Sequence, residues 1–246
     1  MLPLLSLCLA ASLPCAHAAN VLLNNNFEAF SIDSGNYNLA FNSTTNPDGY
    51  TANFSNGTPP KLSRQYQETA TGMGWLTTAP DNNIEIWQSG HTSVPSADGT
   101  GQFAEINANT SAALYQDVTI DLAGLVDYSF LHRGRSGTDT LQVTITYLGL
   151  DNQFGTGDDQ VMVAQQFSTG NSAWVLYDQQ DQFTSVANGV YRFSFGAVSS
   201  AGGDLSFGNF IDNVNFGVAA APVPEPSAAL LGGLGVLGLF GRRRRA

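Results

Sequence analysis

The segment from Leu141 to Tyr147 alternates apolar and polar residues, and this alternation constrains the fold more than any other feature. Leu141-Gln-Val-Thr-Ile-Thr-Tyr147 places its apolar side chains on one side and its polar ones on the other, as in a strand with one buried face. No convincing amphipathic helix pattern occurs between Asn20 and Ala219. Shorter alternating runs and the spacing of turn residues predict further strands at 20–30, 84–88, 102–107, 112–120, 126–132, 160–167, 173–180, 190–195 and 205–216.

The body of the chain has the size of one ordinary domain. Residues 20–219 suffice for a sizeable core, and no internal repeat of roughly 20–50 residues recurs. Many short strands separated by Gly, Asn, Asp and Ser predict an all-β fold, an antiparallel β-sandwich of the jelly-roll type. The stretch 31–66 is rich in Asn, Thr and Pro, and we interpret it as a long loop or as a hairpin added to the rim of the sandwich.

The N-terminus carries the pattern of an export signal. Leu2 to Leu13 is apolar, and Ala16-His-Ala18 offers small residues at the two positions that a signal peptidase recognises. We therefore interpret residues 1–19 as a signal peptide, with the mature chain beginning near Asn20. No Lys or Arg precedes the apolar stretch, which is a departure from the usual pattern. Cys15 leaves a lipoprotein as the alternative, which the proline before it disfavours.

The C-terminus combines three elements in an order typical of sorting segments. A Pro-flanked acidic element comes first, a small-residue-rich apolar stretch follows, and four arginines precede the last alanine. The apolar stretch, about 226–241, has 16 residues, or ~24 Å as a helix against about 30 Å for a bilayer core. We interpret 220–246 as a membrane-sorting segment that ends in a cytoplasmic arginine stop. The alternatives are a retained short anchor or a core helix, which its glycines disfavour.

The acidic element and the arginine run carry a family resemblance through Val223, Pro224, Glu225, Pro226, Arg242, Arg243, Arg244 and Arg245. This tail resembles the PEP-CTERM sorting signal of exported proteins of Gram-negative bacteria. The resemblance implies processing by an exosortase-type membrane protease after transient anchoring in the inner membrane. It further implies export to the cell surface or the extracellular matrix, and it says nothing about activity.

Charge and cysteine content exclude several functions. The chain has 9 basic and 20 acidic residues, and residues 20–221 keep five basic residues against 19 acidic ones, a net charge of −14. Such a surface repels nucleic acid and anionic lipid and suits a secreted protein that binds cations. Cys8 and Cys15 both fall in the signal peptide. The mature chain therefore has no thiol for a disulfide, a metal site or a nucleophile.

Short motifs along the body follow an order typical of one group of domains. The body opens with Val21-Leu-Leu-Asn-Asn-Asn-Phe-Glu28 and closes with Phe210-Ile-Asp-Asn-Val214. Between these two motifs stand Gly74-Trp75, Ile84-Glu-Ile-Trp87, Gln102-Phe-Ala-Glu-Ile-Asn107, Leu114-Tyr-Gln-Asp117 and Tyr128-Ser-Phe130. The series resembles bacterial surface domains of the galactose-binding-like, jelly-roll carbohydrate-binding class, although Asn25 replaces a usual glycine. This resemblance implies a noncatalytic glycan-binding or cell-surface module.

Aromatic side chains are the first candidates for a glycan site, because their faces stack on the apolar faces of sugar rings. Trp75 is the preferred stacking residue, since it follows Gly72 and Gly74 in a loop-like stretch. Trp87 and Tyr115 are further candidates. The competing interpretation, which general burial statistics favour, places each tryptophan in the sandwich core.

The turn after the strand at 126–132 is a second candidate for the ligand site. Its residues His132, Arg133 and Arg135 flank a glycine, and two arginines on such a loop suit bidentate binding of the carboxylates of an acidic polysaccharide. The competing and favoured interpretation is pairing with Asp139 or another acid of the protein. His132 has no identifiable catalytic partner, so the sequence predicts no catalytic residue.

Calcium is the expected cofactor, in a structural role. The glycine-containing loop from Asp151 to Asp159 concentrates oxygen ligands, with Asp151, Asp158 and Asp159 as candidates. A solvated acidic hairpin is an equally weighted alternative. The resemblance to carbohydrate-binding domains adds Glu28 and Asp212, because the first and last strands of that class lie side by side and acids there can share a structural calcium.

Three functions remain open for the sequence. The leading one is a noncatalytic exported protein that binds a glycan, with exopolysaccharide as the ligand implied by surface sorting. The second is a secreted polysaccharide hydrolase, for which Glu85, Glu105 and Asp117 are nominal carboxylates. A surface adhesin or ice-binding-like protein is the third and weakest, because no regular threonine repeat is present.

Overall fold

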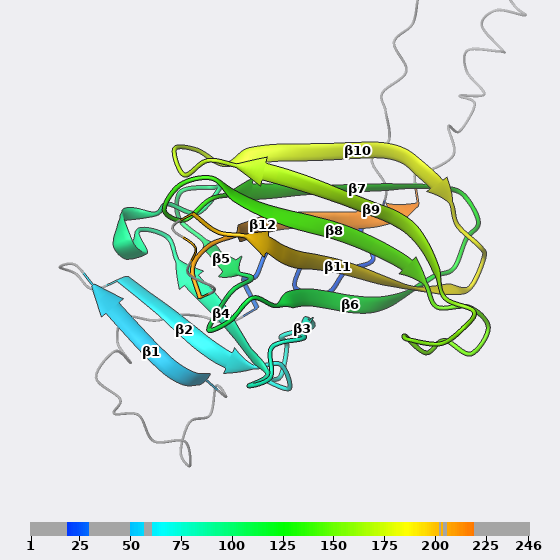
Figure 1. The fold of residues 1–246 in the computed structure, drawn as a ribbon, viewed down its shortest axis with the longest axis horizontal. Helices are drawn as coiled ribbons and strands as arrows, with labels where there is room; N and C mark the ends of the chain where they lie inside the picture. The colour runs from blue at the N-terminus through cyan, green and yellow to red at the C-terminus, as the bar shows by residue number, and fades with distance from the viewer. Residues whose placement is uncertain (1–18, 30–49, 57–60, 202, 204–205, 219–246) are drawn as a thin grey trace, which may run out of the picture. The chain divides into compact units, whose positions relative to one another are not determined.

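Two antiparallel β-sheets pack face to face in the computed structural model of the chain (Figure 1). The structure describes residues 19–29, 50–56, 61–201, 203 and 206–218, with the backbone alone for 50–56 and 61–62. Ala18–Ala219 form one compact unit. The predicted signal peptide at 1–19, apart from Ala19, and the predicted sorting segment at 220–246 lie outside the described residues.

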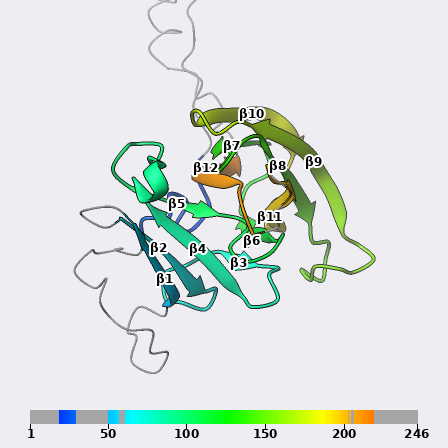
Figure 2. The same ribbon diagram turned by 60° about the vertical axis from the view of Figure 1, so that its left-hand side comes forward.

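The larger sheet has seven strands in the order β1-β2-β4-β5-β12-β7-β10. Figure 2 shows β1 and β2 extending this sheet beside β4. The strands are β1 (Tyr50–Asn56), β2 (Lys61–Gln67), β4 (Asn83–Gln88), β5 (Gln102–Glu105), β7 (Leu125–Arg133), β10 (Val175–Thr184) and β12 (Phe210–Val218).

The smaller sheet has five strands in the order β3-β6-β11-β8-β9. Its strands are β3 (Leu76–Thr77), β6 (Ala113–Ile120), β8 (Asp139–Tyr147), β9 (Gln160–Thr169) and β11 (Gly189–Ser199). A short 3-10 turn, η2 (His91–Ser93), follows β4. The described residues include no helix long and apolar enough to cross a membrane.

The predicted all-β antiparallel sandwich of the jelly-roll type is confirmed. From β6 to β12 the chain repeatedly crosses between sheets: β6, β8, β9 and β11 belong to the smaller sheet and β7, β10 and β12 to the larger one. The stretch predicted as a loop or added hairpin contributes the antiparallel pair β1–β2 at the rim of the larger sheet. Residues 30–49 of that stretch lie outside the described part of the chain.

The strand predicted at 20–30 is wrong. Residues 23–29 form bends and turns instead, and Val21 and Leu22 have no regular secondary structure, because Asn24 and Phe27 adopt positive φ angles of 43° and 59°, which interrupt an extended backbone. The segment nevertheless lies along β12, since the Val21 N–H donates to the Phe216 carbonyl at 2.9 Å and the Val214 N–H donates to the Asn25 carbonyl at 2.8 Å.

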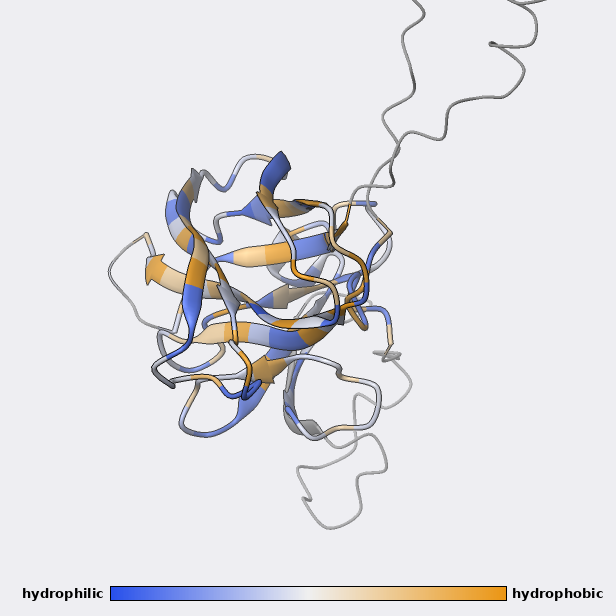
Figure 3. Cartoon of the chain, turned by 90° about the vertical axis from the view of Figure 1, so that its right-hand side faces the viewer, coloured by the Kyte–Doolittle hydropathy of each residue, from blue (hydrophilic) through white to orange (hydrophobic). Residues whose placement is uncertain are grey.

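The main core lies between the two sheets. Leu141, Val143 and Ile145 are fully buried in it, as their alternation predicts, together with the inward residues of β11 and β7. Figure 3 shows the same alternation as hydrophobic and hydrophilic colours along the strands. Burial of these side chains is the main stabilising term of the fold, about 1.5–3 kcal/mol for each large aliphatic or aromatic residue.

A second apolar cluster lies on the other side of the seven-stranded sheet. It consists of Trp87, Val94, Phe103 and Phe210, with Trp174 packed against it. Their strand neighbours Ile86, Ala104 and Ile211 belong to the main core, so alternation directs this cluster to the opposite face. The loop that contains η2 supplies Val94, and it therefore covers part of this face.

Candidate functional site

Trp75 lies in the main core, so its predicted role as a sugar-stacking residue is wrong. Its side chain is fully buried. The indole N–H donates to the Asn24 carbonyl at 3.0 Å, and the ring packs on Phe27 and Phe195 at centroid distances of 5.5 Å and 6.1 Å. The bends at 23–29 bring Asn24 and Phe27 over Trp75, and a ring enclosed in this way has no face left for a ligand.

Trp87 is buried as well, in the second apolar cluster. Its ring lies 4.8 Å from that of Phe210 and 4.5 Å from that of His91. The guanidinium carbon of Arg135 lies 4.7 Å from the ring centroid. The predicted ligand role of Trp87 is therefore corrected to a structural one, because protein atoms cover the ring on all sides.

The residues of the predicted arginine turn bind other parts of the protein. His132 is fully buried, with Nε2 3.1 Å from Asn209 Oδ1, and burial lowers its pKa to about 4. Arg135 Nη1 lies 2.9 Å and 3.3 Å from the two carboxylate oxygens of Glu105. The Arg135 backbone N–H donates to Asp139 Oδ2 at 2.8 Å. Internal pairing, the competing interpretation, is therefore confirmed for Arg135.

Arg133 lies beside Phe210 in the register of β7 and β12, and burial lowers the pKa of its guanidinium. Alternation sends its side chain to the face opposite His132. His132 and Arg133 therefore face opposite sides of the sheet, and Arg135 is paired with Glu105, so the structure does not bring the three predicted residues together as one site.

The three carboxylates nominated for a hydrolase do not flank a cleft. Glu85 and Glu105 are direct cross-strand neighbours in the seven-stranded sheet, and both are buried. Asp117 belongs to β6 in the other sheet and is bound to Arg192. Carboxylates on opposite sides of a sugar ring need access to substrate, and Glu85 and Glu105 have none.

The acidic loop is held by hydrogen bonds from its own carboxylates. Asp158 Oδ2 accepts the Leu150 N–H at 2.7 Å, Asp159 Oδ2 accepts the Gly155 N–H at 2.6 Å, and Asp151 Oδ1 accepts the Gln153 N–H at 2.9 Å. The Thr156 hydroxyl donates to Asp158 Oδ1 at 2.8 Å. These contacts favour the acidic-hairpin interpretation, in which the carboxylates shape the loop between β8 and β9.

Glu28 and Asp212 do lie near each other, and Asp98 joins them. Asp212 is 3% exposed and accepts the Ala97 N–H at 3.3 Å. Burial raises its pKa to about 7, and the charges of Glu28 and Asp98 add to that shift. Glu28 accepts hydrogen bonds from the backbone and side chain of Gln102. The structure thus brings together acids from three distant segments, two of which were predicted from the sequence.

Among the described residues, no group of three or more His, Cys, Asp or Glu side chains is arranged to hold a metal ion. A calcium ion near Glu28 and Asp212 would therefore need backbone or amide oxygens beside the carboxylates, which calcium sites commonly use. The carboxylates themselves suit a hard cation, because Asp212 is buried and lies close to the negative charges of Glu28 and Asp98.

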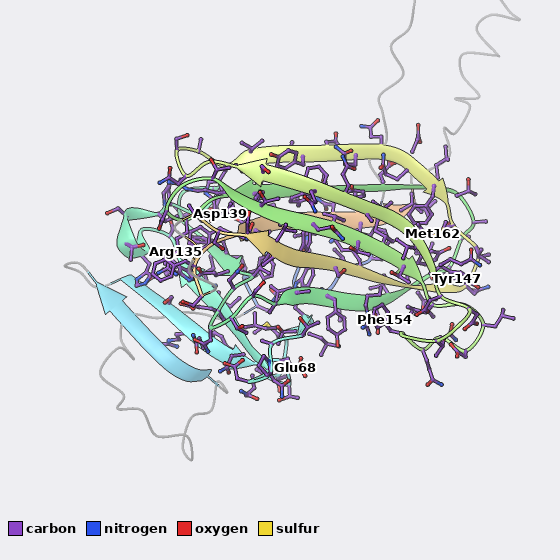
Figure 4. The ribbon with its side chains drawn as sticks, in the orientation of Figure 1. Glu68, Arg135, Asp139, Tyr147, Phe154 and Met162 are labelled. Atoms are coloured by element: carbon purple, nitrogen blue, oxygen red, sulfur yellow. The ribbon has the colours of Figure 1, made fainter. Side chains whose placement is uncertain are left out.

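One solvent-facing cluster combines aromatic rings with a charged group. Arg192 of β11 lies between the rings of Tyr115 on β6 and Phe154 on the acidic loop, at 3.9 Å and 4.1 Å from their centroids. Its Nε and Nη2 donate to the two oxygens of Asp117, each at 2.7 Å. Phe154 is 55% exposed. Figure 4 labels Phe154 beside β6, with Arg135 and Asp139 toward the other end of the sandwich.

The same outer face continues across the five-stranded sheet as amide and hydroxyl groups. Ser194 and Thr144 lie next to this cluster in register, and Gln142 pairs with Gln166 on β9. The Gln166 amide donates to Gln142 Oε1 at 3.3 Å. All four side chains are half-buried or exposed. The face that we call the aromatic–arginine face thus consists of Tyr115, Asp117, Phe154, Arg192 and this polar continuation.

Gly196 leaves the backbone of this face open. A Cβ at Gly196 would make only ordinary contacts, at 3.9 Å from Ala113 Cβ and from the Gln142 carbonyl oxygen. The fold therefore does not require a glycine in the middle of β11. A strand glycine of this kind permits close approach of a ligand to the backbone.

Tyr115 is the predicted aromatic candidate that the structure places on an outer face without enclosing it in an apolar cluster, whereas Phe154 and Arg192 were missed. Phe154 stands in the loop that the sequence analysis assigned to calcium. Arg192 alternates with the buried residues Tyr191 and Phe193, so its outward direction was readable from the strand pattern. Its neighbours across β6 and β8 were not, because register is not encoded locally.

Comparison with known proteins gives one family match. Residues 222–245 match the family model described as the PEP-CTERM protein-sorting motif. This match indicates an exported protein that is anchored in the membrane before an exosortase processes it. No curated protein is significantly similar to the chain.

Solved structures that are similar to the chain include carbohydrate-binding modules. The C-terminal family 22 module of Xyn10B from Clostridium thermocellum is 15% identical, with 73% of this chain and 99% of that one covered and a TM-score of 0.40. The CBM22-1 xylan-binding domain of Xyn10C from Paenibacillus barcinonensis is 14% identical, with 65% of this chain and 94% of that one covered and a TM-score of 0.39. A family 35 module from Clostridium thermocellum is 10% identical, with 64% of this chain and 98% of that one covered and a TM-score of 0.36. Likeness at this level carries no argument about the ligand of this chain.

Proposed function

We propose that the sandwich is a noncatalytic glycan-binding domain and that the aromatic–arginine face is its binding surface. The observation that carries this proposal is the exposed ring of Phe154, fixed beside Tyr115 by the guanidinium of Arg192. The aromatic groups supply apolar contact for the faces of sugar rings. The amides and hydroxyls of the polar continuation supply hydrogen bonds for the sugar hydroxyls, and a few placed polar groups beside apolar surface are the usual design of a ligand site.

Phe154→Ala is expected to weaken polysaccharide binding by about 1–3 kcal/mol, or about 5- to 150-fold, the size of an aromatic stacking contact. Thermal stability should stay unchanged, because the ring is largely exposed. Affinity electrophoresis in gels that contain neutral polysaccharides measures the binding. Leu150→Ala is the matched control, since Leu150 is 91% exposed near the start of the same segment. Equal retention of Phe154→Ala and the wild type would contradict the proposed face.

A polysaccharide hydrolase and an adhesin or ice-binding-like protein are the alternative functions. No contact in the described part of the chain favours either one. Steady release of reducing ends from a bound polysaccharide by the purified domain would replace noncatalytic binding with hydrolysis.

Calcium is proposed as a structural ion bound by Glu28 and Asp212, with Asp151, Asp158 and Asp159 as the competing location. Calcium should raise the melting temperature relative to chelator, because an ion that binds only the folded state stabilises it by mass action. Asp212→Ala should remove this gain, whereas the double change Asp158→Ala and Asp159→Ala should leave most of it. Differential scanning calorimetry checks this. Identical melting curves of the wild type in calcium and in chelator would rule out both locations.

The proposed destination is the cell surface or the extracellular matrix, where exopolysaccharide is available as a ligand. The motif match at 222–245 supports sorting by an exosortase-type protease. Serine at Arg242 to Arg245 should leave unprocessed precursor in the membrane, because the cytoplasmic charge stop is lost. Mass spectrometry of the wild-type mature C-terminus tests cleavage. A mature chain that still ends with the arginines would show that the tail is retained.

A further inference from the structure

The proposed glycan-binding face contains one basic side chain among its strands. The segments Leu76–Thr77, Ala113–Ile120, Asp139–Tyr147, Gln160–Thr169 and Gly189–Ser199 make up the five-stranded sheet. Arg192 is the one lysine or arginine in them. Whether this face can attract an anionic glycan therefore depends on whether the charge and the N–H groups of Arg192 are already paired within the protein.

Asp117 engages Arg192 fully on one edge. The two hydrogen bonds, each 2.7 Å long, form a bidentate pair, which is the strongest arrangement of a guanidinium with a carboxylate. Burial lowers the pKa of Arg192, but the hydrogen bond and charge of Asp117 outweigh it and raise the pKa above its usual value, with a smaller contribution from Asp159. The cation is thus paired with one carboxylate of the protein, Asp117, and feels the charge of a second.

Aromatic rings also cover the guanidinium. Tyr115 and Phe154 lie on it at 3.9 Å and 4.1 Å, and the Arg192 side chain is 16% exposed. The N–H groups that Asp117 leaves open belong to a guanidinium whose charge Asp117 already neutralises, so an incoming carboxylate gains less there than from an unpaired arginine. It would also meet the negative charge of a body that carries five basic and 19 acidic residues in 20–221. The remaining polar groups of the face are amides and hydroxyls, which suit uncharged sugars.

We propose that Asp117 is a specificity-determining residue: by occupying Arg192 it restricts the aromatic–arginine face to neutral glycans and excludes uronate-containing ones. This inference rests on the proposed function, because it concerns the ligand class of the same face. In the alternative, the pair is a purely structural contact between β6 and β11. A structural contact affects stability and does not change which polysaccharides bind.

Asp117→Asn separates the two roles. The amide keeps the shape and one acceptor for Arg192, and it releases the charge and part of the guanidinium edge. The expected result is a gain of about tenfold or more in binding to polygalacturonate, abolished by high salt because the new contact is ionic. The double variant Asp117→Asn with Arg192→Gln should lose this gain. Asp121→Asn, which removes one exposed acid just beyond β6, is the control and should not show it.

Affinity electrophoresis in unbranched neutral β-glucan, in xylan and in polygalacturonate, with melting curves for each variant, is the measurement. Wild-type binding to polygalacturonate as strong as to the neutral polymers would overturn the proposal, as would an Asp117→Asn variant without gain. A wild type that binds none of the polymers would count against the proposed function. The response of Asp117→Asn to polygalacturonate would still decide whether Asp117 blocks Arg192.

Discussion

Trp75→Ala should lower the free energy of unfolding by about 3–5 kcal/mol, the usual cost of removing a buried tryptophan. The side chain is fully buried, packs on Phe27 and Phe195, and donates to the Asn24 carbonyl. Its loss would leave a cavity and an unsatisfied carbonyl beneath the bends at 23–29. Because a domain of this kind is stable by about 5–15 kcal/mol, this one change removes a large fraction of its stability. Urea denaturation followed by fluorescence measures it.

Two further variants make this test decisive. Trp75→Phe retains an aromatic ring against Phe27 and Phe195 and should fold, with a smaller loss that reflects the missing N–H donor. Trp174→Ala should also cost less than Trp75→Ala, because Trp174 is half-buried at the edge of the second apolar cluster. If Trp75→Ala melted like the wild type and lost glycan binding, the stacking role would be restored and the core assignment would fail.

Glu85 and Glu105 should make the stability of the domain fall as pH rises. Burial raises the pKa of Glu85, and burial together with the charge of Glu85 raises the pKa of Glu105 well above its usual value. A carboxyl whose pKa is higher in the folded state binds its proton more tightly there. Its contribution is therefore fully present below the unfolded pKa of about 4.3 and is lost as pH rises toward the folded value, by about 1.4 kcal/mol per pH unit per proton.

Two neighbouring groups oppose the rise in the pKa of Glu105 that burial and Glu85 cause. Arg135 is the cation in contact with Glu105, and it is stacked between Trp87 and Phe207 at 4.7 Å and 3.9 Å. The Gly208 N–H donates to Glu105 Oε1 at 2.8 Å. Gly208 has a φ of 110°, and a Cβ there would collide with Asp139. The loop around Gly208 is therefore shaped to deliver this one donor to a buried acid.

Glu85→Gln should flatten the pH dependence and raise stability at pH values above the raised pKa of Glu85, since it removes a buried charge while an amide can still meet Gln65. Glu105→Ala should act in the opposite direction, with a loss of about 3–5 kcal/mol, because it leaves Arg135 without its carboxylate. Chemical denaturation across neutral and mildly alkaline pH measures both changes. Subtracting the Glu85→Gln profile from the wild type removes the contributions of His132 and Asp212. A difference profile without slope would contradict the assignment.

Part of the fold was predictable because strand patterning is local. Leu141, Val143 and Ile145 are buried as their spacing requires, and Ile84 and Ile86 face the main core while Trp87 faces away from it. The same pattern gave a wrong prediction for the segment at 20–30. Its apolar residues Val21, Leu22 and Phe27 resemble a strand pattern. Phe27 nevertheless contacts Trp75 with a positive φ, and a backbone angle of this kind cannot be predicted from the spacing of apolar residues.

The candidate site was predictable only in fragments. Tyr115 was predicted as an aromatic ligand residue. The loop that contains Phe154 was predicted as a calcium site because of its carboxylates, and Phe154 itself was not named. The contact of Arg192 with Asp117 joins residues 75 positions apart, and the Glu28–Asp98–Asp212 group joins three segments whose spacing along the chain carries no common pattern. Such groups exist only once the strands have paired.

The sequence by itself determined the features that depend only on residues close together along the chain. These are the sorting motif at 222–245 and the alternating strands of the body. The tertiary structure alone decided which aromatic residues are available to a ligand. Trp75, placed among glycines, is buried because the bends at 23–29 close over it, and Phe154, placed among acids, is exposed because its loop folds onto Arg192. The physical reason is that burial and charge pairing depend on strand register, which brings distant residues together, whereas alternation and short motifs depend on neighbours along the chain.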